Sequence, residues 1–159
     1  MVLDEWMELA LTLAAEAESD GEVPIGAVVI GPGGEVIGRG RNRRESGDPL
    51  GHAEIYAIRE ASRAIGDWRL TGSTMVVTLE PCAMCAGAVV NARISRLVYG
   101  ASDPKAGFCG SLGNLVQDPR LNHRMVVEGG FMEERSRQLL QSFFQQLRAR
   151  DRTERWQSG

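Results

Sequence analysis

A pair of cysteines, Cys82 and Cys85, is the feature that most constrains how this 159-residue chain can fold. They lie three residues apart at the predicted start of a helix, directly after Pro81, and proline is well tolerated in a first helical turn. Positions three apart share one helix face, and the positive end of the helix dipole favours thiolates. Two thiolates can supply half of a tetrahedral zinc site. The fold therefore has to bring ligands from a distant segment to this helix start.

His52 is the candidate third ligand, and Glu54 follows it at the start of another predicted helix. Deep within a helix these two side chains would point to nearly opposite sides, but at the helix entrance both can face one point. Three protein ligands leave the fourth zinc position to water, which is typical of a catalytic site. The sequence thus predicts one zinc ion per chain, with Glu54 outside the metal shell as the proton carrier.

Two other interpretations of the cysteine pair remain open at this point. A thioredoxin-type redox pair is one, although no tryptophan precedes Cys82 and a histidine–acid pair stands upstream. A purely structural zinc site is the other, and it would need His123 or Cys109 as its fourth ligand. That arrangement would leave Glu54 without a purpose, so the catalytic interpretation is favoured.

Predicted strands alternate with predicted helices along the chain, which indicates a layered α/β domain. Glycine-rich GPGG between two short β-rich runs indicates a hairpin, because glycine adopts the backbone angles that a tight turn needs. We expect a three-layer α/β/α fold whose sheet of about five strands is mixed and mostly parallel. We expect one domain over residues 1–150 and a flexible tail over 151–159. Strands are predicted at 25–30, 35–40, 73–79, 94–101 and 124–130, and helices at 2–18, 53–66, 82–92 and 131–150.

Charge is unevenly distributed along the sequence. The formal net charge is −3, yet the first 22 residues hold seven acidic and no basic residues, so the remainder carries +4. A nucleic-acid partner is therefore compatible with the composition. No apolar run is long enough to cross a bilayer, and acids occupy the N-terminal region where a signal peptide has basic residues. We expect a cytoplasmic protein without a membrane partner.

The sequence resembles the bacterial tRNA-specific adenosine deaminases of the zinc-dependent cytidine/deoxycytidylate deaminase superfamily over nearly its whole length. Histidine-x-glutamate followed by proline-cysteine-x-x-cysteine is the zinc signature of nucleobase deaminases. Flanking segments favour the transfer-RNA branch. The matching stretches include EVPIGAVV, GRNR, DPLGHAEIYAIR, TLEPCAMCAGAVVNARI, SDPKAG, LNHR and LLQSFF.

The resemblance implies a cytidine-deaminase-like fold and hydrolytic conversion of adenosine to inosine at the wobble position of an arginine transfer RNA. The target base would be extruded from the anticodon loop into the site. Zinc on His52, Cys82 and Cys85 would activate water, and Glu54 would transfer the protons.

The resemblance also implies substrate contacts outside the zinc signature. Asn42 would hydrogen-bond the flipped nucleoside, Ile25 would form an apolar wall, and Asp103 and Lys105 would contact the neighbouring nucleotides. On the C-terminal helix, aromatic and basic side chains would meet RNA; those residues are Phe143, Phe144 and Arg148. Glu80 is interpreted as a helix-start residue, since acids favour that end of the dipole.

Two alternative functions remain compatible with the sequence. The first is a deaminase of free bases or nucleosides, guanine or cytosine for example, with the same zinc site. The second is a non-catalytic zinc-containing subunit that binds RNA. The resemblance implies the anticodon stem-loop of a transfer RNA as the partner. A second copy of the chain is also expected, because AGAVVNA offers a small-residue helix face.

Overall fold

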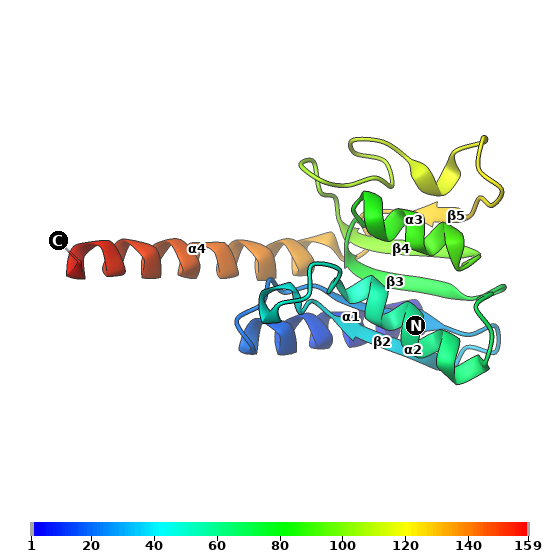
Figure 1. Cartoon of the computed structure of the whole chain (residues 1–159), viewed down its shortest axis with the longest axis horizontal. Coiled ribbons are helices and arrows are strands. Elements are labelled where there is room, and N and C mark those ends of the chain that lie inside the picture. The colour runs from blue at the N-terminus through cyan, green and yellow to red at the C-terminus, as the bar shows by residue number, and fades with distance from the viewer. Residues whose placement is uncertain (1, 159) are drawn as a thin grey trace.

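The computed structural model describes residues 2–158, which form a five-stranded sheet with helices on both faces (Figure 1). This confirms the predicted α/β fold with helices on both faces of the sheet. The elements in chain order are α1 (Val2–Ser19), β1 (Gly26–Ile30), β2 (Val36–Arg41), the 3-10 turn Arg44–Ser46, α2 (Ala53–Ile65), β3 (Thr74–Leu79), α3 (Ala83–Asn91), β4 (Arg96–Ala101), the 3-10 turn Leu115–Gln117, β5 (Val126–Glu128) and α4 (Glu133–Gln157).

The sheet is mixed, with strand order β2-β1-β3-β4-β5. β1 runs antiparallel to both of its neighbours, whereas β3, β4 and β5 are parallel to one another. The parallel part is thus limited to one half of the sheet. Because β2 and β3 are both antiparallel to β1, they run in the same direction, and α2 connects them as a crossover. The carboxyl ends of β2, β3 and β4 consequently lie at one edge, from which α2 and α3 both begin.

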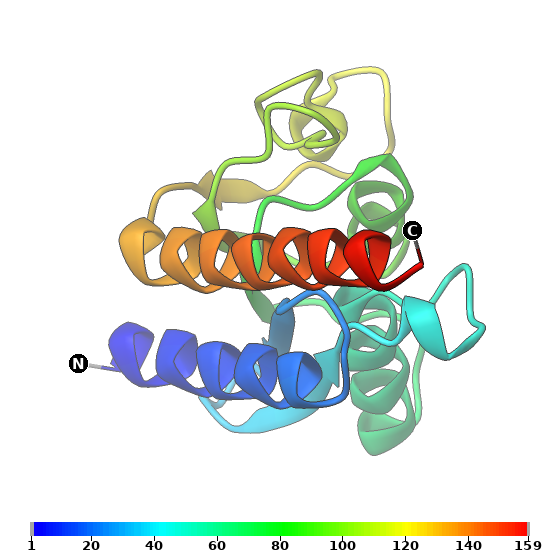
Figure 2. The same cartoon turned by 90° about the vertical axis from the view of Figure 1, so that its left-hand side faces the viewer.

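Two hydrophobic cores cover the two faces of the sheet, and side chains of the central strands alternate between them. On β1, Ala27 and Val29 face α2 and α3, while Val28 and Ile30 face α1. Figure 2 shows α1 and α4 side by side in front of the sheet. All five residues of β1 are buried, as expected of a strand covered on both sides.

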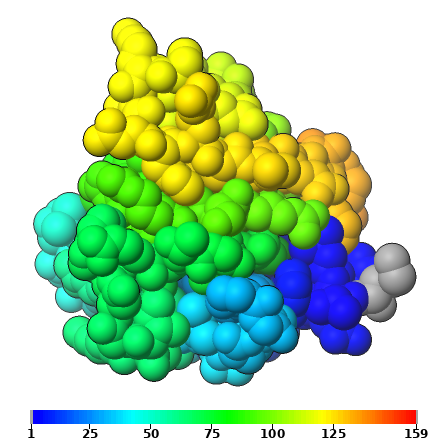
Figure 3. All heavy atoms as spheres, turned by 90° about the vertical axis from the view of Figure 1, so that its right-hand side faces the viewer, coloured from blue at the N-terminus to red at the C-terminus, as the bar shows by residue number. Residues whose placement is uncertain are grey.

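The opposite side of the molecule from the free end of α4 is formed largely by loops and by helix α2. Figure 3 shows α2, the turn between β1 and β2, and the segment before β5 gathered there. No helix among residues 2–158 combines the length and apolar character needed to cross a membrane.

Helix α4 is longer than the sequence suggested. It continues to Gln157 and extends beyond the rest of the molecule (Figure 1), so residues 151–157 of the tail that was expected to be flexible are helical. Leu139 packs into the core beneath α1, whereas the side chain of Trp156 is 87% exposed. Alternating Arg, Asp and Glu side chains at the end of this helix favour helix but carry no apolar face, which is why periodicity did not reveal it. Gly159 and Met1 lie outside the described residues, and the flexibility of the terminus stays a prediction.

The backbone of α2 lies directly on β2. A Cβ atom at Gly38 or Gly40 would overlap the backbone of α2 at Ala57 or Ala53. The contacting helix face consists of Ala53, Ala57 and Ala61, all fully buried and four residues apart. Small residues on both elements thus permit the close approach that sets the position of the α2 N-terminus.

We expect Gly40→Ala to lower the free energy of unfolding by about 1–3 kcal/mol, because an added methyl group has to displace the helix backbone. Urea unfolding followed by circular dichroism measures the change. Arg39→Ala is the matched control, since Arg39 lies on the same strand with an exposed side chain and should cost less than about 0.5 kcal/mol. Equal losses for the two variants would contradict the close packing of α2 on β2.

Candidate metal and catalytic site

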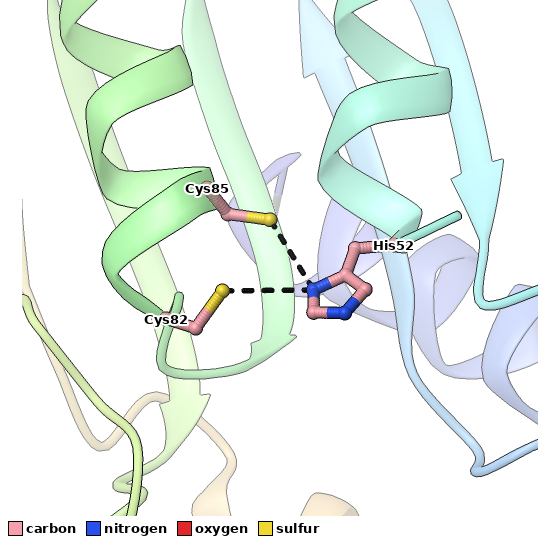
Figure 4. Close-up of side chains that lie close together, drawn as sticks. All are labelled: His52, Cys82 and Cys85. Atoms are coloured by element: carbon pink, nitrogen blue, oxygen red, sulfur yellow. Dashed lines mark hydrogen bonds between the residues drawn. The ribbon is translucent and has the colours of Figure 1, made fainter. Parts of the chain in front are cut away.

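Two helix N-termini bring the predicted metal ligands together. His52 immediately precedes α2 and Cys82 immediately precedes α3, and both have extended backbone angles, while Cys85 lies in the first turn of α3. The Nδ1 atom of His52 is 3.6 Å from the Sγ atom of Cys82 and 3.5 Å from that of Cys85 (Figure 4). All three ligand atoms lie within 4.8 Å of one another.

These separations suit a zinc ion. Zn–S bonds of about 2.3 Å and Zn–N bonds of about 2.0 Å at tetrahedral angles imply an N···S separation of about 3.5 Å. Two sulfurs and one imidazole nitrogen are also donors that bind zinc in preference to harder cations such as magnesium. The cluster therefore has the identity and the spacing of three ligands of a tetrahedral site, with a fourth position left for a non-protein ligand.

The residues considered as a fourth ligand are engaged elsewhere. His123 hydrogen-bonds through Nε2 to the carbonyl oxygen of Ile94 at 2.6 Å. The Cys109 thiol is buried and points toward the carbonyl oxygen of Pro81, 3.9 Å away. Neither belongs to the ligand cluster found among residues 2–158. The arrangement thus disfavours a closed structural zinc site.

Protonation of the two thiols is strongly asymmetric. A hydrogen bond from Cys85, together with the nearby His52 ring, lowers the pKa of Cys82 to about 4 against the effect of partial burial. The same pairing and burial raise the pKa of Cys85. The hydrogen bond with Cys82 also raises the pKa of His52. One thiolate is therefore already present at neutral pH, which prepares the cluster to receive a cation.

Glu54 lies in the first turn of α2 with only 4% of its surface exposed. Burial raises the pKa of this carboxyl group to about 7, because a charged carboxylate is costly away from water. A group with a pKa near neutrality can both accept and return a proton at physiological pH. This property suits the proton-carrier role expected for Glu54.

The loop before His52 is held by contacts among its own residues and α2. The Tyr56 hydroxyl donates a hydrogen bond of 2.6 Å to Asp48, and the Arg43 amide donates one of 2.8 Å to the carbonyl oxygen of Gly51. A Cβ atom at Gly51 would lie 2.9 Å from the Asp48 carbonyl oxygen and 3.1 Å from the Tyr56 hydroxyl. Glycine at this position therefore lets the loop pack closely where it enters α2.

A cavity of about 560 Å³ opens beside the cluster, a size typical of small-molecule sites. Its lining includes Glu54 together with His52 and Cys82. Five of the seven substrate contacts suggested by the resemblance also line it, whereas Phe143 and Arg148 do not. Those five are Ile25, Asn42, Asp103, Lys105 and Phe144.

Asn42 and Asp103 shape the backbone around the cavity as well as lining it. The Asn42 side-chain amide donates to the carbonyl oxygen of Val23 at 3.3 Å, and its oxygen accepts the Arg44 amide at 3.2 Å. Asp103 Oδ1 accepts the amides of Lys105 and Ala106 in a turn. The turn roles that their residue types suggest are thus present in the structure.

Sequence reasoning missed two charged residues of the cavity lining, Arg44 and Glu80. Arg44 lies in an aperiodic loop, where its residue type carries no positional signal. Glu80 was interpreted as a helix-start residue, but its carboxylate is buried and binds the segment after β4. The position of Glu80 between a buried strand and Pro81 was the one available signal, and it says nothing about a partner more than twenty residues away.

Comparison with known proteins places the whole chain. The family model of MafB19-like deaminases matches residues 1–148. The tRNA-specific adenosine deaminase of Bacillus subtilis (strain 168) is 48% identical over 157 residues, which are 98% of this chain and 97% of that protein.

Solved structures agree with this placement. A chain from a study of A-to-I editing by tRNA:A34 deaminases superimposes with a TM-score of 0.82 at 47% identity, covering 86% of this chain and 99% of that one. A guanine deaminase from Nitrosomonas europaea has a TM-score of 0.76 at 23% identity, with 87% and 82% covered, a likeness that concerns the fold alone. The signature ligands, the buried glutamate and the near-complete match together show that this chain belongs to the tRNA-specific adenosine deaminase family.

Proposed function

We propose that this protein converts adenosine to inosine at the wobble position of a transfer RNA by hydrolytic deamination. The observation that carries the proposal is the position of Glu54, buried beside the His52, Cys82 and Cys85 cluster at a cavity large enough for a nucleoside. The relatives' activity supports the same substrate. Because the proposed substrate is a transfer RNA, we also propose a cytoplasmic location.

One zinc ion per chain is proposed for the cluster, where it would supply a Lewis acid that lowers the pKa of water to about 7. The two cysteine sulfurs and the His52 ring would hold the ion, and His52 and Cys82 also line the cavity. Placement of the ligands on two helix starts keeps their geometry rigid, because each helix is anchored to the sheet.

Glu54 moves the protons in this proposal. Its carboxylate accepts a proton from the attacking water and delivers it to the ring nitrogen N1 of adenine, next to the carbon under attack. A second proton from the added hydroxyl passes through Glu54 to the departing amine, so that adenosine and water yield inosine and ammonia. A pKa near 7 lets Glu54 make both transfers without a large energy mismatch.

Recognition of RNA is proposed for the residues around the cavity mouth. Ile25 and Asn42 line the inner cavity and suit contacts to the extruded nucleoside. Lys105 and Asp103 also line the cavity, Lys105 with an exposed and Asp103 with a half-buried side chain, and they suit contacts to the adjacent nucleotides. Phe144 is 40% exposed and lines the cavity from α4, so its ring is available to stack on a base.

Arg148 extends this surface along α4. It lies one helical turn beyond Phe144, on the same side of the helix, with an exposed side chain. A phosphate of the anticodon stem-loop is the partner that an exposed arginine at this place suits.

The two alternative functions differ from this proposal in their substrates. A free-base deaminase would not need the exposed side chains of Lys105, Phe144 and Arg148. A non-catalytic subunit would have no use for a buried, proton-accepting Glu54. Turnover of free guanine or cytosine without turnover of transfer RNA would establish the first alternative.

A homodimer is proposed through the outward face of α3. The inward face of this helix, which includes Cys85, Ala86 and Val89, is fully buried against the rest of the chain. The residues on the other side of the helix are half-buried or exposed, and a Cβ atom at Gly87 would meet nothing within 4 Å. Its outward residues are Met84, Gly87, Ala88 and Asn91.

We expect Glu54→Gln to lower the rate of inosine formation by about 10²–10⁴-fold while bound zinc stays at the level of the unmodified protein. The assay uses in vitro transcribed arginine transfer RNA with adenine at the wobble position. Glu60→Gln is the control, because Glu60 lies exposed on the same helix and should retain full activity. Full activity of Glu54→Gln would exclude Glu54 from the chemistry.

We expect Cys85→Ser to lose most of its zinc, because a serine hydroxyl is a far poorer zinc ligand than a thiolate. Zinc per chain is measured by plasma mass spectrometry after dialysis. Cys109→Ser should keep its zinc, since this buried thiol lies outside the ligand cluster. Equal zinc contents in the two variants would contradict the assignment.

We expect Gly87→Arg to convert a dimer into a monomer, since a charged side chain would be forced between two closely packed α3 helices. Light scattering after size-exclusion chromatography measures the mass, and circular dichroism checks that the variant is folded. A purely monomeric unmodified protein at micromolar concentration would remove the dimer proposal.

A further inference from the structure

A second buried carboxylate, that of Glu80, lies beside the cavity without any part in the metal cluster or in proton transfer. Glu80 follows the last residue of β3 and precedes Pro81, and only 2% of its surface is exposed. A charged group so well buried needs hydrogen-bonding partners to offset the loss of water. The identity of those partners shows what Glu80 does.

All the partners of Glu80 come from one segment, residues 103–111. Oε1 accepts the amide of Asp103 at 3.0 Å and the hydroxyl of Ser111. Oε2 accepts the amides of Cys109 and Ser111, each at 3.0 Å. Both carboxylate oxygens are therefore fully used, and the segment is gathered around a single side chain.

Outside the Glu80 carboxylate, the segment is held mainly near Phe108 and Cys109, which pack in the hydrophobic core, whereas residues 102–106 are exposed or half-buried. It contains no helix or strand, and most of its residues from 102 to 111 are exposed or half-buried. The amide of Phe108 donates to the carbonyl oxygen of Pro81 at 2.9 Å. A Cβ atom at Gly107 would overlap the Glu80 carboxyl group, so the chain passes directly over it.

The same segment carries Asp103 and Lys105 to the edge of the cavity. We propose that Glu80 is a positioning residue for substrate recognition: its carboxylate fixes the 103–111 segment so that Lys105 and Asp103 meet the nucleotides beside the target adenosine. This inference rests on the proposed function, because those nucleotides exist only in a polynucleotide substrate.

Glu80→Gln tests the inference selectively. A glutamine has one oxygen, which can still accept the amides of Cys109 and Ser111 at the Oε2 position. Its NH₂ group then occupies the Oε1 position, where it can donate to the Ser111 hydroxyl but faces the Asp103 amide, a second donor. The substitution thus frees the Asp103 end of the segment and retains the other end.

Glu22→Gln is the matched control. Glu22 is also buried, at 4% exposure, and its Oε1 atom accepts one hydrogen bond, from the Glu45 amide at 2.8 Å. One acceptor oxygen is enough there, so a glutamine can replace it. The same chemical change should therefore have a small effect on KM at Glu22 and a large effect on KM at Glu80.

Steady-state kinetics on an arginine anticodon stem-loop provide the main measurement. We expect Glu80→Gln to raise KM by about five- to tenfold, the effect of one lost buried hydrogen bond, with kcat and zinc content nearly unchanged. In a Lys105→Ala background the same substitution should raise KM less than about twofold, because the residue it positions is gone. Amide hydrogen exchange should accelerate at Asp103 and stay slow at Cys109.

An unchanged KM, an equal rise in both backgrounds, or a loss of activity that follows loss of zinc would each overturn the inference. Should Glu80→Gln not fold, Ser111→Ala carries the test, since it removes one donor to Oε1 and should raise KM to a smaller extent. Failure of the proposed function is a separate result, in which the zinc-loaded unmodified protein forms no inosine while amide exchange at Asp103 still depends on Glu80.

Discussion

The direction of the strands is the constraint on which the site depends. Because β1 lies between β2 and β3 and is antiparallel to both, the chain leaves β2 and β3 at the same edge of the sheet. Both connections at that edge enter helices, and His52 and Cys82 are the residues immediately before these helices. Reversal of either strand would place one ligand about a strand length away, which is roughly 17–20 Å.

Helix starts also serve the chemistry of the site. They place the Cys85 side chain and the His52 ring beside Cys82, and the hydrogen bonds from these two groups lower the pKa of Cys82. At the same point, the extended residue before each helix lets successive side chains converge instead of fanning out around the axis. One structural element therefore provides both the geometry of the ligands and the protonation state that they need.

The local parts of this arrangement were predictable from sequence, and the long-range parts were not. The cluster of His52, Cys82 and Cys85 could be predicted because metal ligation needs particular residue types at particular helix positions. Alternation of strands and helices predicted the mixed, mostly parallel sheet, in which all described strands but β1 run in one direction, but it does not reveal that β1 is inserted between β2 and β3. Glu80 was misinterpreted because a buried carboxylate is defined by its partners, and these follow it by more than twenty residues.

The separation of the ligands along the chain has a consequence for folding. His52 and Cys82 are 30 positions apart, and β3 lies between them. An ion held by both acts as a cross-link that closes this loop, and closing a loop of that length in the unfolded chain costs about 3.6 kcal/mol of conformational entropy. Metal binding would therefore favour the folded chain over the unfolded ensemble. The site for chemistry would then also stabilise the fold, by joining the segments on either side of the central strand β3.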